Sequence, residues 1–172
     1  MGAHVTLVSG PVALPCPAGV NRQMVRGAEE MYEACTAAFE TADIAIMAAA
    51  VADFTPAEPA AHKIKKDTGL NVIHLKPTRD ILAELGKRKR NEQTLVGFAL
   101  ETESGEDQAL DKLRRKNCDY IVLNSLENPG AGFGSDTNQV TIFAKDGRKK
   151  ELSLALKKEI AQGLVEWICD IV

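Results

Sequence analysis

A carboxylate and a group of lysines follow an apolar run, and this stretch has the residue types best suited to chemistry. The run spans 44–51 and ends in small residues such as Ala50; Asp53 comes next, and KIKK follows at 63–66. A run of this length fits a buried strand, and small side chains at its end let a ligand or another backbone come close. Open α/β folds bind ligands at the carboxyl ends of their strands. The pattern fits a charged ligand near Asp53 and Lys63, and it fits an alanine-rich core strand followed by a solvated loop equally well.

Two further segments carry groups that suit an anionic ligand. Thr78 is a candidate N-cap for a helix with Leu82 and Leu85 on one face. The unpaired N–H groups of a helix N-terminus suit a phosphate or another polar ligand. Lys112 and Lys116 are four residues apart in a predicted helix at 104–117, so they share one face. Both features also have a plain structural interpretation, because most helix N-termini bind nothing and helix lysines are commonly solvated.

The elements that must position these residues alternate between strand and helix. Apolar runs bounded by turn residues predict strands at 4–9, 44–51, 94–101 and 120–124. Apolar periodicity predicts helices at 21–41, from 78 onward, at 104–117 and at 155–172. The Asp146-Gly147 pair predicts a hairpin between strands at 139–144 and 150–154. We therefore expect one α/β domain over residues 1–172, with a Rossmann-like, mostly parallel sheet, helices on both faces and an antiparallel hairpin appendage.

Composition and charge exclude several classes of protein. The 172 residues are 45% hydrophobic and 26% charged, which is ordinary for a globular domain with its own core. The formal net charge of −3 argues against a nucleic-acid partner. Lysine and arginine gather instead in short groups at 63–66, 87–90, 112–116 and 148–150. Any binding of anions is therefore expected to be local.

The cysteines and the hydropathy pattern indicate a cytoplasmic protein that does not enter a membrane. The four cysteines have no CxxC spacing and no paired histidines, which favours free thiols over zinc or disulfides: Cys16, Cys35, Cys118 and Cys169. No apolar stretch approaches the roughly 20 residues of a membrane span. The first residues also lack the charged head and apolar core of a signal peptide.

Several segments, in order, resemble one enzyme family from nearly one end of the chain to the other. They are VTLVSGP at 5–11, AAAVADF at 48–54, KIKK at 63–66, TRDIL at 78–82, GFALET at 97–102, the Lys112 and Lys116 pair, KNCDYIVLN at 116–124, and GFGSDTNQVTIF at 132–143 with the closing helix. Together they resemble the phosphopantothenate–cysteine ligase family of the bacterial, CTP-dependent type. Each segment is a weak signal, whereas their order and spacing are specific.

The resemblance implies a ligase of coenzyme A biosynthesis. In this family the carboxylate of 4′-phosphopantothenate attacks the α-phosphate of CTP, releasing pyrophosphate and leaving an acyl-cytidylate. The amine of cysteine then displaces CMP and gives 4′-phosphopantothenoylcysteine. Such chemistry depends on positioning and on neutralising charge with Mg²⁺ and lysine. The resemblance also implies a homodimer, for which we expect the hairpin at 139–154 to be exchanged or paired between the two copies.

The same resemblance assigns roles to individual residues. Lys63 is the implied catalytic residue, on a mobile flap that closes over the substrate and excludes water. Asp53 acts through Mg²⁺ or through a ribose or base contact. The implied nucleotide-binding residues are Ala50, Asp53, Lys63, Arg79, Asp80, Ile81, Leu82, Phe98, Lys112 and Lys116.

One part of the family pattern has no counterpart in the sequence. The family usually begins with a strand, a Gly-Gly-Thr turn and an Asn-Arg-Ser-Ser-Gly-Lys-like segment, often preceded by a flavin-dependent phosphopantothenoylcysteine decarboxylase. The sequence starts at what would be the second strand. We therefore expect residues 1–172 alone to bind CTP more weakly than a version restored at its N-terminus, and to have little or no ligase activity.

Two other functions are compatible with the same pattern of elements. A nicotinamide-dependent oxidoreductase of Rossmann type shares the fold class, but the prolines of SGPVALPCP at 9–17 spoil a dinucleotide-binding turn. A non-catalytic module that self-associates through the hairpin is the second alternative. The sequence alone does not decide whether the nucleotide is CTP or ATP.

Overall fold

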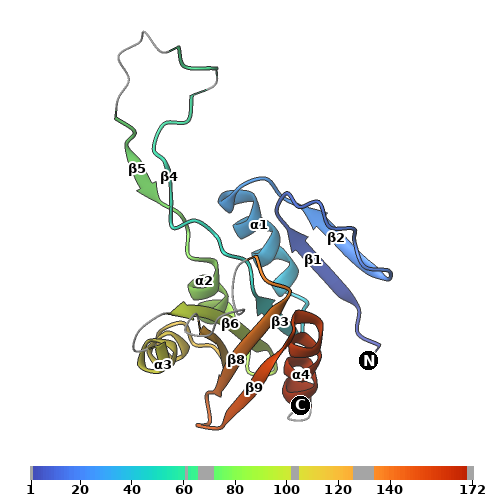
Figure 1. The fold of residues 1–172 in the computed structure, drawn as a ribbon. Helices are drawn as coiled ribbons and strands as arrows, with labels where there is room; N and C mark the ends of the chain where they lie inside the picture. Colours follow the sequence, from blue (N-terminus) through green and yellow to red (C-terminus); the bar gives the residue numbers. More distant parts are fainter. Residues whose placement is uncertain (1, 61, 66–71, 102–104, 126–133, 170–172) are drawn as a thin grey trace. The chain divides into compact units, whose positions relative to one another are not determined.

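The computed structural model describes residues 2–60, 62–65, 72–101, 105–125 and 134–169 (Figure 1). The chain forms two compact units. The first unit comprises Met1–Glu40 and Ala49–Ile81; the second comprises Thr41–Ala48 and Leu82–Val172. Among the described residues, no helix has the length and apolar character that crossing a lipid bilayer requires.

The second unit is built on a five-stranded sheet. Its strands lie in the order β3 (Ile44–Met47), β6 (Thr94–Glu101), β7 (Tyr120–Ser125), β8 (Thr137–Ala144) and β9 (Lys149–Leu156). The first three are parallel to one another, while β8 is antiparallel to β7 and β9 is antiparallel to β8. The hairpin predicted from Asp146-Gly147 is therefore confirmed, with Gly147 at a φ of 92° in its turn. Strand β8 of the hairpin pairs with β7, so the hairpin extends the main sheet.

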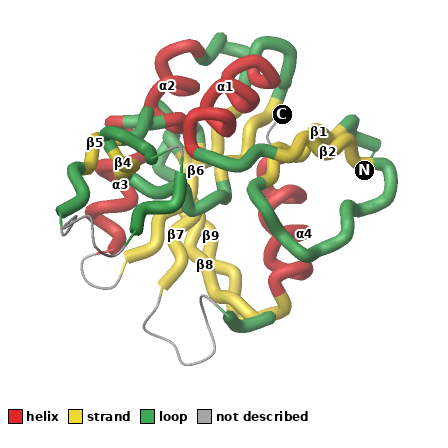
Figure 2. The backbone as a smooth tube through the Cα atoms, turned by 90° about the horizontal axis from the view of Figure 1, so that it is seen from above, coloured by secondary structure: helices red, strands yellow, loops and turns green. Residues whose placement is uncertain are grey.

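Helices cover both faces of this sheet, as the alternation of elements predicts. Helix α4 (Lys157–Cys169) packs on one face, where it encloses a core of alternate strand residues: Val96, Tyr120, Val122, Val140, Ile142 and Ala144 with Ile160, Leu164 and Ile168. Figure 2 shows α3 (Gly105–Arg115) on the opposite side of the strands from α4. The α/β fold class is thus confirmed, including the mostly parallel order of β3, β6 and β7.

The first unit contains a parallel strand pair, a helix and an antiparallel ribbon. Strand β1 (Val5–Ser9) pairs with β2 (Val20–Met24) in parallel, and α1 (Ala28–Phe39) follows them. Strands β4 (Phe54–Pro56) and β5 (Leu75–Pro77) form the ribbon. Backbone hydrogen bonds extend the ribbon, since the amide of Ala57 donates to the carbonyl of His74 at 2.8 Å.

Three predictions about this unit and its boundary are wrong. The segment predicted as the start of a helix at 21 is strand β2, and the helix begins at Ala28, after Gly27 as its N-cap. The stretch after Asp53, which contains Pro56 and Pro59, is interpreted from the sequence as loop, whereas Phe54–Pro56 forms strand β4 and pairs with β5. Helix α2 begins at Ile81 and ends at Arg88, so Thr78 does not cap it. In each case a partner distant in the sequence decides the structure, and local patterns do not contain that information. The strand predicted at 44–51 is also shorter than expected and ends at Met47.

Candidate functional site

Thr78 joins the two segments of the first unit that contain predicted site residues. Its amide donates to the carbonyl of Asp53 at 2.9 Å, and its hydroxyl donates to the carbonyl of Ala52 at 2.7 Å. These bonds hold the turn that leads into α2 against the end of the small-residue segment. The structure therefore brings Asp53 close to Arg79 and Asp80 through their backbones, and the side chain of Asp53 is exposed. Ala50, three residues before Asp53, is exposed as well.

Arg79 is bound to helix α1. Its Nε donates to Oε2 of Glu29 at 3.1 Å, and its Nη2 pairs with Oε1 of the same carboxylate. The guanidinium also lies 3.6 Å from the centre of the Tyr32 ring, within the range of a cation–π interaction. Glu29 and Tyr32 could not be identified from the sequence, since nothing local indicates a partner some fifty positions away along the chain.

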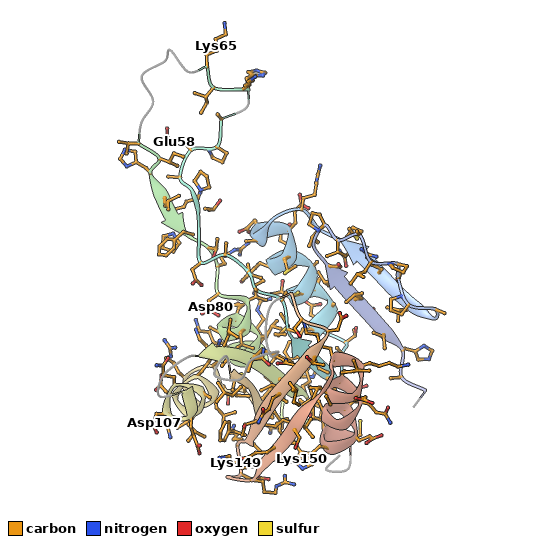
Figure 3. The ribbon with its side chains drawn as sticks, in the orientation of Figure 1. Glu58, Lys65, Asp80, Asp107, Lys149 and Lys150 are labelled. Atoms are coloured by element: carbon orange, nitrogen blue, oxygen red, sulfur yellow. The ribbon has the colours of Figure 1, made fainter. Side chains whose placement is uncertain are left out.

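Lys63 lies in the segment between β4 and β5, where its side chain is exposed. Figure 3 shows the neighbouring Lys65 far along this connection, beyond Glu58. Within the described part of the chain, Lys63 makes no hydrogen bond or ion pair with Asp53 or Arg79. Lys66, the last residue of KIKK, lies outside the described residues. The loop position predicted for Lys63 is confirmed, whereas its catalytic role stays a prediction.

In the second unit, the structure brings Phe98 and Lys112 together. The ammonium of Lys112, on α3, donates to the carbonyl of Phe98, on β6, at 2.8 Å. Leu82 of α2 packs over Gly97 on the same strand; a Cβ at Gly97 would lie 2.8 Å from Cδ2 of Leu82. Gly97 therefore permits a close approach, and the groups that approach are the side chains of Leu82 and Ile121.

Lys116 occupies the end of helix α3, in a Schellman motif. The amide of Cys118 donates to the carbonyl of Leu113 at 3.0 Å, and the amide of Asn117, at a φ of 51°, donates to Arg114 at 3.1 Å. The turn that follows lies at the amino ends of the strands, because the amide of Asp119 donates to Leu95 at the start of β6. Ligands in open α/β folds bind at the opposite edge. Of the two predicted lysines, Lys112 is the one nearer that edge.

A charged pair supports the same end of the sheet. The side chain of Lys89 is only 8% exposed and donates to Oδ1 of Asp119 at 2.6 Å. The other carboxylate oxygen of Asp119 accepts a hydrogen bond from the amide of Leu95 at 2.7 Å. Burial, with a smaller contribution from the charge of Asp119, raises the pKa of Cys118 to about 12. Cys118 is thus a neutral, structural thiol, and all four cysteines are free, as predicted.

The donor set suits magnesium only together with a ligand that brings its own oxygens. Among the described residues, no group of three or more histidines, cysteines or carboxylates could hold a metal ion. Asp53 supplies one exposed carboxylate beside the Arg79–Asp80 turn. Mg²⁺ commonly binds one or two carboxylates plus substrate phosphates and water. The residues present fit that mode, in which Asp53 would be the protein ligand.

Comparison with known proteins identifies the family. The family model described as "DNA/pantothenate metabolism flavoprotein C-terminal domain" matches residues 1–171. The chain is 48% identical, over 99% of its length, to the coenzyme A biosynthesis bifunctional protein CoaBC of Bacillus subtilis, of which it covers 42%. It is 53% identical, over its full length, to a cysteine/cysteine sulfinic acid decarboxylase of an unknown prokaryotic organism, of which it covers 48%. The chain thus spans less than half the length of these relatives.

A solved structure agrees with this result. The crystal structure of the C-terminal domain of CoaBC superimposes with a TM-score of 0.80 at 41% identity, covering 97% of this chain and 74% of that one. The resemblance drawn from the sequence is thereby confirmed. The chain belongs to the family of the DNA/pantothenate metabolism flavoprotein C-terminal domain.

Proposed function

We propose that the chain is a phosphopantothenate–cysteine ligase of coenzyme A biosynthesis that uses CTP. The observation that carries this proposal is the similarity to CoaBC along nearly the whole chain, in sequence and in fold. The junction between Asp53 and the turn before α2 supports it, because it brings an exposed carboxylate and the amino end of a helix together within the first unit.

In the proposed reaction a carboxylate oxygen of 4′-phosphopantothenate attacks the α-phosphorus of CTP, and the bond to pyrophosphate breaks. The cysteine amine then attacks the acyl carbon, loses a proton, and CMP departs. The exposed ammonium of Lys63 would neutralise the reacting carboxylate and the acyl-cytidylate once its segment closes. Mg²⁺, held by Asp53 and the phosphates, would supply charge neutralisation when bound.

The remaining predicted residues have roles that differ in how directly they meet the nucleotide. In the first unit, the backbone of Arg79, Asp80 and Ile81 would contact the nucleotide at the start of α2. In the second unit, Lys112 and Phe98 form one hydrogen-bonded pair, which supports a joint role. Leu82 would act by packing over Gly97. Ala50 and Lys116 are assigned by the resemblance alone.

We further propose a homodimer that works in the cytoplasm, joined to a flavin-dependent decarboxylase in the longer protein. The hairpin β8–β9 packs within its own sheet, so exchange between copies is not needed to support it. Strand β9 is the last strand of that sheet and pairs on one side only among the described strands. Pairing of two β9 edges is therefore the form of dimer that we propose.

Thermal shift and product analysis test the ligase proposal. CTP with Mg²⁺ should raise the melting temperature of the 172-residue chain more than ATP, NAD or NADP does at equal concentration. In a longer protein that contains the chain, pyrophosphate release should require both CTP and 4′-phosphopantothenate, and CMP release should require cysteine as well. Stabilisation by NAD or NADP without any effect of CTP would instead support the oxidoreductase alternative.

A further inference from the structure

The guanidinium of Arg79 is already occupied by α1. Two of its nitrogens pair with the two carboxylate oxygens of Glu29, and its plane stacks on Tyr32. Tyr32 is buried, at 7% exposure, so the ring is a fixed platform. Arginine is suited to such a place, because its planar fork matches a carboxylate and its face stacks on an aromatic ring.

This arrangement fixes the turn before α2 from a second side. Thr78 ties the turn to Ala52 and Asp53, and Arg79 ties it to α1. Both sets of contacts belong to the first unit. The turn is thereby held between two segments that are distant in the sequence, as preorganisation of a binding site requires.

The same contacts make Arg79 poorly suited to bind a phosphate directly. A phosphate at its fork would have to displace the carboxylate of Glu29, whose charge would then repel the incoming anion. We infer that Arg79 is a positioning residue, and that Glu29 and Tyr32, through Arg79, hold the turn that receives the nucleotide. This inference rests on the proposed function for its ligand, whereas the fixing of the turn does not depend on it.

Glu30 provides a matched control on the same helix. Glu29 and Glu30 both lie in the first turn of α1, where the helix dipole stabilises a negative charge. The carboxylate of Glu30, however, accepts a hydrogen bond from the amide of Arg26 at 2.8 Å and pairs with the Arg26 side chain, not with Arg79. Replacing either glutamate removes one charge from the helix end, but only Glu29→Gln weakens the hold on the turn.

The primary test follows the amide of Thr78 by hydrogen exchange, which needs no ligand. Glu29→Gln and Tyr32→Leu should speed exchange of this amide about five- to tenfold, since each removes a charge-assisted or cation–π contact of a half-exposed arginine. Glu30→Gln and Tyr32→Phe should leave the exchange rate within about twofold of the wild type. The first keeps the ion pair between Arg79 and Glu29, and the second keeps the aromatic ring under Arg79. Unchanged exchange in Glu29→Gln would overturn the inference.

CTP binding separates positioning from direct contact. The double variant with Glu29→Arg and Arg79→Glu exchanges the two charges. Compared with each of these replacements alone, it should recover part of the protection of the Thr78 amide and part of the CTP affinity in parallel. Recovery of protection without any recovery of affinity would show that Arg79 itself binds the nucleotide, and would overturn the positioning role. Failure of a longer protein that contains the wild-type chain to bind CTP would refute the proposed function, and the exchange comparison would still decide whether Glu29 and Tyr32 hold the turn.

Discussion

Gly86, in α2, should not tolerate even one added methyl group. A Cβ at this position would lie 1.9 Å from the carbonyl oxygen of Lys116 and 2.9 Å from its carbonyl carbon. The obstacle is backbone, and it belongs to the Schellman motif that ends α3, so it cannot rotate away as a side chain would. The side-chain amide of Asn117 also donates to the carbonyl of Gly86 at 2.8 Å.

The expected cost of Gly86→Ala follows from these contacts. The backbone at Lys116 would have to retreat by about 1.5 Å to reach ordinary contact, an overpacking that typically costs about 1–3 kcal/mol. Loss of the hydrogen bond from Asn117 adds about 1 kcal/mol, while the better helix propensity of alanine returns up to about 1 kcal/mol. The last two contributions roughly cancel, so we expect the free energy of unfolding to fall by about 1–3 kcal/mol.

Gly163, in α4, is the matched control. A Cβ there would meet only the two terminal methyl groups of Leu152, at 3.4 Å, which is an acceptable contact with a flexible side chain. Gly163→Ala should therefore raise the free energy of unfolding, by at most about 1 kcal/mol. Urea denaturation followed by the fluorescence of Trp167, the single tryptophan, measures both variants. Equal effects of the two substitutions would refute the reasoning, because helix propensity alone would then explain them.

Three further results are expected. Lys63→Gln should lower turnover about 10²–10³-fold in an active ligase without changing the melting temperature, because it removes one charge from an exposed loop position that the proposal places at the reacting carboxylate. Asp119→Asn should lower the free energy of unfolding by about 3 kcal/mol in urea denaturation, because it leaves the buried ammonium of Lys89 without its counter-ion. Cys118, whose pKa is about 12, should resist thiol reagents in the folded chain below pH 10, and it should make stability fall as the pH rises above about 9, since the unfolded thiol loses its proton first.

Each of these has a control within the chain. Lys65→Gln should leave turnover nearly unchanged, and equal losses in both lysine variants would mean that the loop is merely basic. Glu92→Gln breaks the exposed pair with Arg90 and should not measurably change stability. The exposed Cys16 should react with the same thiol reagent that spares Cys118, and fast labelling of Cys118 at pH 8 would contradict its buried, neutral state.

The parts of the fold that could be predicted have their signals within a few residues. Strands β6 and β7 are apolar runs between turn residues, and Asp146-Gly147 specifies a hairpin locally. Strand β2 is mostly polar, and it exists because Val20 begins a parallel register with Val5 across the loop. The ribbon of β4 and β5 likewise depends on pairing between segments about twenty residues apart. Such pairing is set by tertiary contacts that override local propensity.

The predicted site divides in the same way. Asp53, Lys63 and the turn at 78–82 could be picked out because the residue types and the resemblance identify them in the sequence. The hold of Glu29 and Tyr32 on Arg79 could not, since it depends on how α1 meets the turn before α2. Thr78 shows the limit most clearly: its position suggested a helix cap, yet its hydroxyl bonds to Ala52.

Lys112 and Lys116 show what helical spacing leaves undetermined. Their i, i+4 spacing correctly placed both on α3 or at its end, on the same side of the helix. It did not indicate where the helix would end. That end is set by Asn117, which takes a left-handed conformation, and by Gly86, whose missing side chain lets the carbonyl of Lys116 come close. Lys112 has its ammonium on the carbonyl of Phe98, while Lys116 is positioned by its backbone at the amino ends of the strands. The two lysines therefore differ in surroundings although their spacing makes them equivalent, and Lys112 is the better candidate to contact a ligand at the carboxyl ends.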